Sequence, residues 1–175
     1  KIIYPGWSAH FRINNWDGTK DHVYRLRHAE KATFEGKIRR EPTDKETIVV
    51  GNLSCNSSRT TGPRPLILKN LIVQDPDVLL FAGDQTYHHT QHTSGWLEFG
   101  MQFRDIMRDR PTITIPDDHD IGQANLWGES GIQATNAAGP SGGYFYAPEY
   151  VNMVQRQQTW HLPDPVDPKP IKRNI

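Results

Sequence analysis

The alternation of short apolar runs with helix-type segments between residues 47 and 116 constrains the fold of this 175-residue chain more than any other feature. The runs TIVVGNLS (47–54), DVLLFAG (77–83) and PTITIP (111–116) are typical of buried strands. Between them, RPLILKNLIVQ (64–74) opens with proline near its first turn, and SGWLEFGMQFRDIMRDR (94–110) spaces its apolar residues three and four apart. The order β-α-β-α-β predicts an α/β fold with parallel strands joined by right-handed crossovers.

The first 46 residues follow a different pattern. VYRLRH (23–28) and ATFEGKIRR (32–40) alternate apolar and polar positions, which predicts two half-exposed antiparallel strands. We therefore divide the chain into the end of a β-rich N-terminal domain with its connector, residues 1–46, and an α/β part, residues 47–175, whose last expected helix covers 148–160. The chain does not begin with Met and ends without a structural stop, so we expect it to be a piece of a longer protein.

Each predicted strand of the α/β part ends in polar residues that can carry chemistry. They are Ser-Cys-Asn (54–56) after the first strand, Asp-Gln-Thr-Tyr-His-His (84–89) after the second, and Asp-Asp-His-Asp (117–120) after the third. Parallel neighbours lie about 4.8 Å apart, and ligands of open α/β sheets bind beyond the carboxyl ends of the strands. We expect these three groups to form one site at that edge of the sheet.

The residue types at this edge indicate a metal site. Several carboxylates on one rim repel one another, and burying them unpaired is costly, so a multivalent cation would stabilise them. Carboxylates alone would indicate Mg²⁺, Mn²⁺ or Ca²⁺. A tyrosine and a cysteine beside them favour a hard, highly charged ion such as Fe³⁺, which removes their protons, with room for a second, divalent metal.

Three motifs in order resemble a known family. The motif GDQTY (83–87), followed by PDDHD (116–120) and preceded by SC (54–55), is similar to the PhoD-like alkaline phosphatases and phosphodiesterases of the calcineurin-like metallophosphoesterase superfamily. The resemblance extends from about Thr47 to Trp127 and implies the first half of an α/β/β/α sandwich. The later ligands of the superfamily are expected beyond Ile175, because only one histidine follows residue 120.

The resemblance implies a binuclear or larger metal centre. Cys55, Asp84 and Tyr87 would bind a ferric ion, with Asp84 bridging to a second metal, Ca²⁺ or another divalent ion. Asp118 stands where the superfamily has the Asn of a GNH[DE] motif and would bind that second metal. The chain lacks the superfamily's Asp-x-His on the first strand, and Cys55 takes the place of that Asp.

The resemblance also implies the reaction. His119 and Asp120 would be the catalytic residues: His119 protonates the leaving group or steadies the phosphoryl oxygens, and Asp120 orients it. The expected activity is hydrolysis of phosphate monoesters or diesters, of small-molecule or phospholipid type, by a metal-activated hydroxide. An extracytoplasmic or secreted location comes from the resemblance alone, since the sequence itself leaves the compartment and the oligomeric state unknown.

Other functions remain open at this point. The alternatives are a non-catalytic α/β binding domain and an inactive fragment of the enzyme; a nucleotide-binding protein is least favoured because no glycine-rich fingerprint follows a strand. The formal net charge is zero, so nothing specifically indicates a nucleic acid. The longest apolar runs, about five residues, are far shorter than the ~20 that cross a bilayer.

Each metal-ligand candidate also has a simpler interpretation. Asp84 after a strand could cap the following turn, and Tyr87 could be a half-buried packing residue. Cys55, the only cysteine, has no internal disulfide partner and could be a small buried hydrophobe.

For the polar residues next to these candidates, a role as metal ligand is likewise compared with a simpler structural role. Asp117 and Asp118 are adjacent and must point in different directions, so we expect only Asp118 to be a ligand. His88, His89 and His92 lie in a polar stretch, and we expect them on a solvated surface rather than in a second metal cluster.

Overall fold

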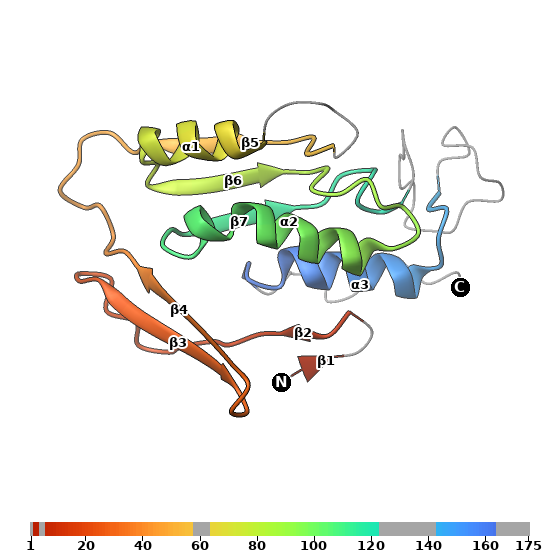
Figure 1. Cartoon of the computed structure of the whole chain (residues 1–175), viewed down its shortest axis with the longest axis horizontal. Coiled ribbons are helices and arrows are strands. Elements are labelled where there is room, and N and C mark those ends of the chain that lie inside the picture. Colours follow the sequence, from red (N-terminus) through yellow and green to blue (C-terminus); the bar gives the residue numbers. More distant parts are fainter. Residues whose placement is uncertain (1, 4–5, 58–63, 123–142, 164–175) are drawn as a thin grey trace.

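The computed structural model describes residues 2–3, 6–57, 64–122 and 143–163. In these ranges the helices pack around a three-stranded parallel sheet, and two short antiparallel pairs of strands precede this sheet in the chain (Figure 1). In chain order the elements are β1 (Ile2–Ile3), β2 (Ser8–Ala9), β3 (His22–His28), β4 (Ala32–Ile38), β5 (Val50–Leu53), α1 (Arg64–Gln74), β6 (Val78–Ala82), α2 (His92–Met107), β7 (Thr112–Ile115) and α3 (Pro148–Thr159).

The parallel sheet has the strand order β5-β6-β7, and α1 and α2 form the two crossovers. Val50 pairs with Val78 across β5 and β6, and Leu80 pairs with Ile113 across β6 and β7. The α/β class and the β-α-β-α-β order are therefore confirmed, as is the antiparallel β3–β4 pair near the N-terminus. Helix α2 begins at His92, two residues earlier than predicted, and ends at Met107.

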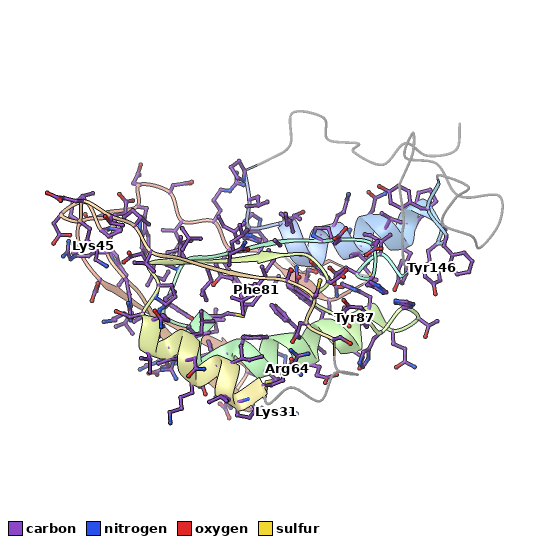
Figure 2. All side chains as sticks on the ribbon, turned by 90° about the horizontal axis from the view of Figure 1, so that it is seen from above. Lys31, Lys45, Arg64, Phe81, Tyr87 and Tyr146 are labelled. Carbon is purple, nitrogen blue, oxygen red and sulfur yellow. The ribbon has the colours of Figure 1, made fainter. Side chains whose placement is uncertain are left out.

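The core lies between β6 and α2. Leu79 and Phe81 face the same side of the sheet because strand side chains alternate, and α2 presents Phe99, Phe103 and Ile106 at helical spacing. These five side chains are at most 4% exposed, and the Phe81 ring meets the Phe99 ring edge-on at 4.9 Å. Figure 2 shows α1 and α2 together on this side of the strands. The packing fixes β6, the strand that leads into the GDQTY motif.

The opposite side of the sheet, which we call the open sheet face, carries Val50, Leu80, Ile113 and Ile115. The strand register brings residues of the three strands side by side there. Val50, Ile113 and Ile115 are 53%, 37% and 41% exposed. Parallel sheets are normally covered on both faces, so the described part of the chain presents an uncovered apolar strip.

Helix α3 lies along the edge of the sheet at β7. The Thr114 hydroxyl of β7 donates to the Gln158 carbonyl oxygen, and the Thr114 N–H donates to His161 Nε2 at 3.3 Å. His161 thereby satisfies an N–H at the edge of the sheet. Val151 of α3 packs with Ile121, which follows the DDHD motif, in a second buried cluster.

The N-terminal segment contacts the α/β part. The Gln157 side chain of α3 donates to the Gly6 carbonyl oxygen at 2.8 Å, and the Tyr24 hydroxyl of β3 donates to the Arg108 carbonyl oxygen at 3.0 Å. The division into residues 1–46 and 47–175 stays a prediction.

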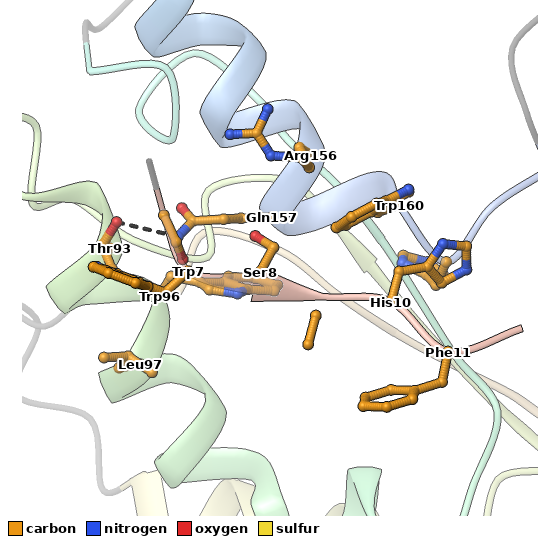
Figure 3. A pocket seen from close by; sticks show the side chains of 13 residues that line it. Trp7, Ser8, His10, Phe11, Thr93, Trp96, Leu97, Arg156, Gln157 and Trp160 are labelled. Atoms are coloured by element: carbon orange, nitrogen blue, oxygen red, sulfur yellow. Dashed lines mark hydrogen bonds between the residues drawn. The ribbon is translucent and has the colours of Figure 1, made fainter. Parts of the chain in front are cut away.

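A cavity of about 490 Å³ lies between the N-terminal segment, α2 and the end of α3. Its lining includes Trp7, Trp96 and Trp160, and Gln157 on its wall donates to Thr93 Oγ1 at 3.1 Å (Figure 3). The six residues predicted to form the site do not line it. Across the described ranges, none of the helices combines the length and the hydropathy needed to cross a bilayer.

Candidate metal centre

Cys55 and Asp84 follow the ends of β5 and β6, and both have a left-handed backbone, with φ of 56° and 57°. This conformation costs roughly 1–2 kcal/mol for a residue other than glycine and persists where surrounding contacts hold it. Here the Cys55 N–H donates to the Gly83 carbonyl oxygen at 3.1 Å, and the Asn56 N–H donates to the Asp84 carbonyl oxygen at 2.8 Å. These bonds hold the two turns side by side.

The Asp84 carboxylate, 5% exposed, is the centre of the site. Its Oδ2 accepts a hydrogen bond from the Tyr87 hydroxyl at 2.9 Å and lies 3.7 Å from Cys55 Sγ. Its Oδ1 accepts from the His119 N–H at 3.2 Å. Residues from all three strand ends therefore meet at one carboxylate.

The protein alone disfavours the ionised forms of Asp84 and Tyr87 relative to the free side chains. Burial, followed by the charge of Asp118, raises the pKa of Asp84, and the Tyr87 hydroxyl offsets part of this rise. Burial and the hydrogen bond to Asp84 raise the pKa of Tyr87 in turn. A multivalent cation would favour the ionised form of both groups, because its charge interacts with the carboxylate and the phenolate directly.

Asp84, Asp118 and His119 each offer one ligand atom, and these atoms lie within 4.8 Å of one another. Carboxylate oxygens with an imidazole nitrogen form a donor set that suits iron and divalent metals. Asp118 Oδ1 accepts the His119 N–H at 2.8 Å, whereas the exposed Asp117 accepts the Asp118 N–H at 2.9 Å. The two neighbouring acids thus differ: Asp118 belongs to this cluster, and Asp117 lies beside it.

Cys55 and Tyr87 extend the donor set through their contacts with Asp84. Cys55 is exposed, so its interpretation as a small buried hydrophobe is wrong. Tyr87 is half-buried, and its ring lies 4.1 Å from that of His119, measured between centroids. Together with Asp84 and Asp118 they provide a thiol, a phenol and two carboxylates, which are donors that suit metal ions, and the His119 imidazole lies beside them.

Asp120 is 1% exposed and binds the main chain. Its Oδ2 accepts the N–H groups of Gln85 at 3.3 Å and Asp117 at 3.1 Å, and its Oδ1 accepts that of Thr86 at 3.0 Å. Burial raises the pKa of Asp120 to about 6, and these N–H groups and Gln158 oppose the rise. Asp120 therefore ties the loop after β6 to the loop after β7.

The three histidines expected on a solvated surface have different surroundings. His88 is partly exposed, with Nε2 3.3 Å from Glu98. His89 is half-buried, and its Nε2 lies 2.7 Å from His119 Nδ1. His92 is 1% exposed, and burial lowers its pKa to about 4, so its surface assignment is wrong. Its spacing of four residues from Trp96 places it on the buried face of α2, a signal present in the sequence.

The fold is similar to that of a solved structure, the purple acid phosphatase PPD1 isolated from yellow lupin (Lupinus luteus) seeds. The TM-score is 0.50 at 17% sequence identity, and the match covers 78% of this chain. The same match covers 26% of the lupin chain, so this chain spans about a quarter of that protein. The likeness concerns the fold, and it agrees with the expected part of a metallophosphoesterase-like architecture. No protein-family model and no curated protein matches the sequence significantly.

Proposed function

We propose that this chain carries part of the metal centre of a phosphate-ester hydrolase of PhoD type. The observation that carries the proposal is the cluster of Asp84, Asp118 and His119, whose ligand atoms lie within 4.8 Å of one another. Cys55 and Tyr87 both contact Asp84, and this is the donor combination that a ferric ion takes in the resembling family. The fold shared with a purple acid phosphatase supports the same reaction class.

In this proposal Cys55, Asp84 and Tyr87 would hold a ferric ion, and Asp118 together with Asp84 would hold a second, divalent metal. The metals would supply charge neutralisation for the phosphoryl oxygens and an activated water. His119 would contribute a proton to the departing oxygen or a hydrogen bond to the phosphoryl group. The substrate class is a phosphate monoester or diester, including phospholipid-type esters, and an extracytoplasmic location accompanies the family assignment.

Elemental analysis with a visible absorption spectrum tests the proposal. We expect stoichiometric iron and an absorption band from tyrosinate or thiolate bound to Fe³⁺. Tyr87→Phe should weaken or remove the tyrosinate component, whereas Tyr24→Phe, which alters a hydroxyl bound to the Arg108 carbonyl oxygen, should leave the spectrum unchanged. Colourless, metal-free protein would instead support a non-catalytic binding domain, with the clusters serving as hydrogen-bonded caps.

Hydrolysis is tested separately in the full-length protein. Asp84→Asn removes the carboxylate that Cys55, Tyr87 and the His119 N–H contact, so we expect loss of phosphate-ester hydrolysis together with loss of iron. Retained hydrolysis in this variant would reject the assignment of Asp84. Iron binding without hydrolysis in the wild-type protein would identify an inactive relative.

A further inference from the structure

We propose that His89 is a positioning residue for His119, holding its imidazole ring by a hydrogen bond between their ring nitrogens. The inference rests on the proposed function, in which His119 faces the phosphoryl group. His89 Nε2 lies 2.7 Å from His119 Nδ1, and the two ring planes are inclined by 25° with 4.9 Å between centroids. Tyr87 also contacts His119, with 4.1 Å between ring centroids.

The main chain of His89 is itself held in place. The Tyr150 hydroxyl of α3 donates to the His89 carbonyl oxygen at 3.0 Å. Gly122, just after the DDHD motif, also approaches closely: a Cβ added there would lie 2.9 Å from the same oxygen. Contacts from α3 and from the loop after β7 therefore fix His89, as a positioning residue requires and a solvated loop residue does not.

Asp120, which the family resemblance suggested for this task, binds other groups. Its two carboxylate oxygens accept main-chain N–H groups of three residues in the loops after β6 and β7. The group placed against a ring nitrogen of His119 is His89.

The direction of the hydrogen bond follows from the chemistry. An imidazolium that gives up its Nε2 proton also carries a proton on Nδ1, which needs an acceptor. Neutral His89, protonated on Nδ1, supplies the lone pair of its Nε2. Its place corresponds to that of the carboxylate that orients histidine in a Ser-His-Asp triad.

The hydrogen bond from His119 Nδ1–H to His89 Nε2 is present both before and after the proton transfer. A water-derived hydroxide bonds to phosphorus, the ester P–O bond breaks, and the departing oxygen takes the Nε2 proton of His119. His119 is then neutral, with its remaining proton on Nδ1 and still bound to His89. His89 thus keeps Nε2 of His119 as the nitrogen available to the phosphoryl group.

Nitrogen-15 NMR of the metal-free chain tests the hydrogen bond independently of any activity. We expect neutral His119 to be a single Nδ1–H tautomer in the wild-type chain. His89→Leu should give a mixture of tautomers, and His89→Gln, whose side-chain oxygen can accept the same hydrogen bond, should restore the Nδ1–H form. An Nε2–H tautomer in the wild type, or no change in His89→Leu, would overturn the proposal.

Kinetics of the full-length protein provide the second readout. We expect His89→Leu to lower kcat roughly 10–100-fold with little change in KM, the usual effect of losing a group that orients a functional residue. His89→Gln should recover most of kcat, and Tyr150→Phe should have an intermediate effect. His88→Leu is the matched control and should keep wild-type kcat, because His88 faces Glu98 at the surface.

The two proposals fail in different ways. If the wild-type protein binds metal and hydrolyses esters but His89→Leu has unchanged kcat, the role of His89 is rejected and the phosphoesterase assignment stands. If the wild type neither binds metal nor hydrolyses esters, the proposed function is rejected, and the NMR tautomers still decide whether His89 holds His119.

Discussion

Asp117 and Asp118 are adjacent carboxylates, yet the structure gives only Asp118 a place in the metal cluster. We expect Asp118→Asn to lose the second metal and to lower kcat on the order of 100-fold or more, since a metal contributes several kcal/mol of transition-state stabilisation. Asp117→Asn should keep its metals and most of its activity, because an amide oxygen can still accept the Asp118 N–H. Metal content and steady-state kinetics of both variants check this; equal losses would contradict it.

The buried His92 gives stability a pH dependence. Its pKa is about 4 in the folded protein and 6.5 in the unfolded chain, so the unfolded state binds more protons between these values. Stability associated with neutral His92 is complete above pH 6.5 and is lost as pH falls toward 4, by up to about 3 kcal/mol. The raised pKa of Asp120 acts in the opposite direction, because the folded state then binds the additional proton.

A variant isolates the contribution of His92. In His92→Gln we expect the decrease in unfolding free energy between pH 7 and pH 4.5 to become smaller than in the wild type, as measured by urea denaturation of the metal-free chain. His88→Gln, in the loop that precedes α2, is the control, because His88 is partly exposed. If the decrease in unfolding free energy between pH 7 and pH 4.5 became smaller by the same amount in both variants, the assignment to His92 would be contradicted.

The sequence predicted those residues of the candidate site whose positions follow from the order of the strands. Cys55, Asp84 and His119 follow three consecutive parallel strands, so their proximity follows from the α/β pattern. The contact between His89 and His119 was not predictable, because it depends on the path of the loop after β6 and on Tyr150, more than 60 residues away in the chain. The sequence also does not reveal that both carboxylate oxygens of Asp120 accept hydrogen bonds from main-chain N–H groups.

The turn after β6 depends on Gly83. Its φ is 99°, and a Cβ there would collide with the Asp117 side chain. We expect Gly83→Ala to lower the free energy of unfolding by about 1–3 kcal/mol, through backbone strain and the displaced Asp117 loop, and to reduce metal binding. Denaturation curves and metal content measure the two effects.

Gly100 of α2, unlike Gly83, has room for a side chain. A Cβ at this helical position meets nothing within 4 Å, so Gly100→Ala should raise the free energy of unfolding by up to about 1 kcal/mol through helix propensity and leave iron content unchanged. A loss of stability at Gly100 as large as that at Gly83 would show that general packing, not the conformation of the turn, is responsible.

The spacing of apolar residues predicted where the helices and strands lie more accurately than it predicted where each of them begins and ends. The spacing of Phe99, Phe103 and Ile106 predicted α2, whereas its start at His92 depends on how the preceding loop returns to the sheet. The 148–160 helix was expected, but its place along β7 depends on Thr114 and His161, whose hydrogen bond spans 47 residues. Such contacts are tertiary and leave no local pattern.

At the scale of the whole molecule, the open sheet face is the main exposed apolar feature of the sheet within the described ranges. We expect the 175-residue chain to associate through Val50, Leu80, Ile113 and Ile115 at high concentration. Ile113→Lys should weaken that association about tenfold, equivalent to about 1.4 kcal/mol, in sedimentation equilibrium. Val73→Lys on α1, where Val73 is 73% exposed, is the control and should have little effect.

The wide sequence spacing of the groups around Asp84 has a consequence for the order of assembly. Cys55 lies 29 residues before Asp84, and His119 lies 35 residues after it. An unfolded chain therefore does not hold Cys55, Asp84 and His119 together, and closing loops of this length carries an entropic cost that sheet formation offsets. Metal capture should follow the pairing of β5, β6 and β7, so the time course of metal loading during refolding would report when these three strands have come together.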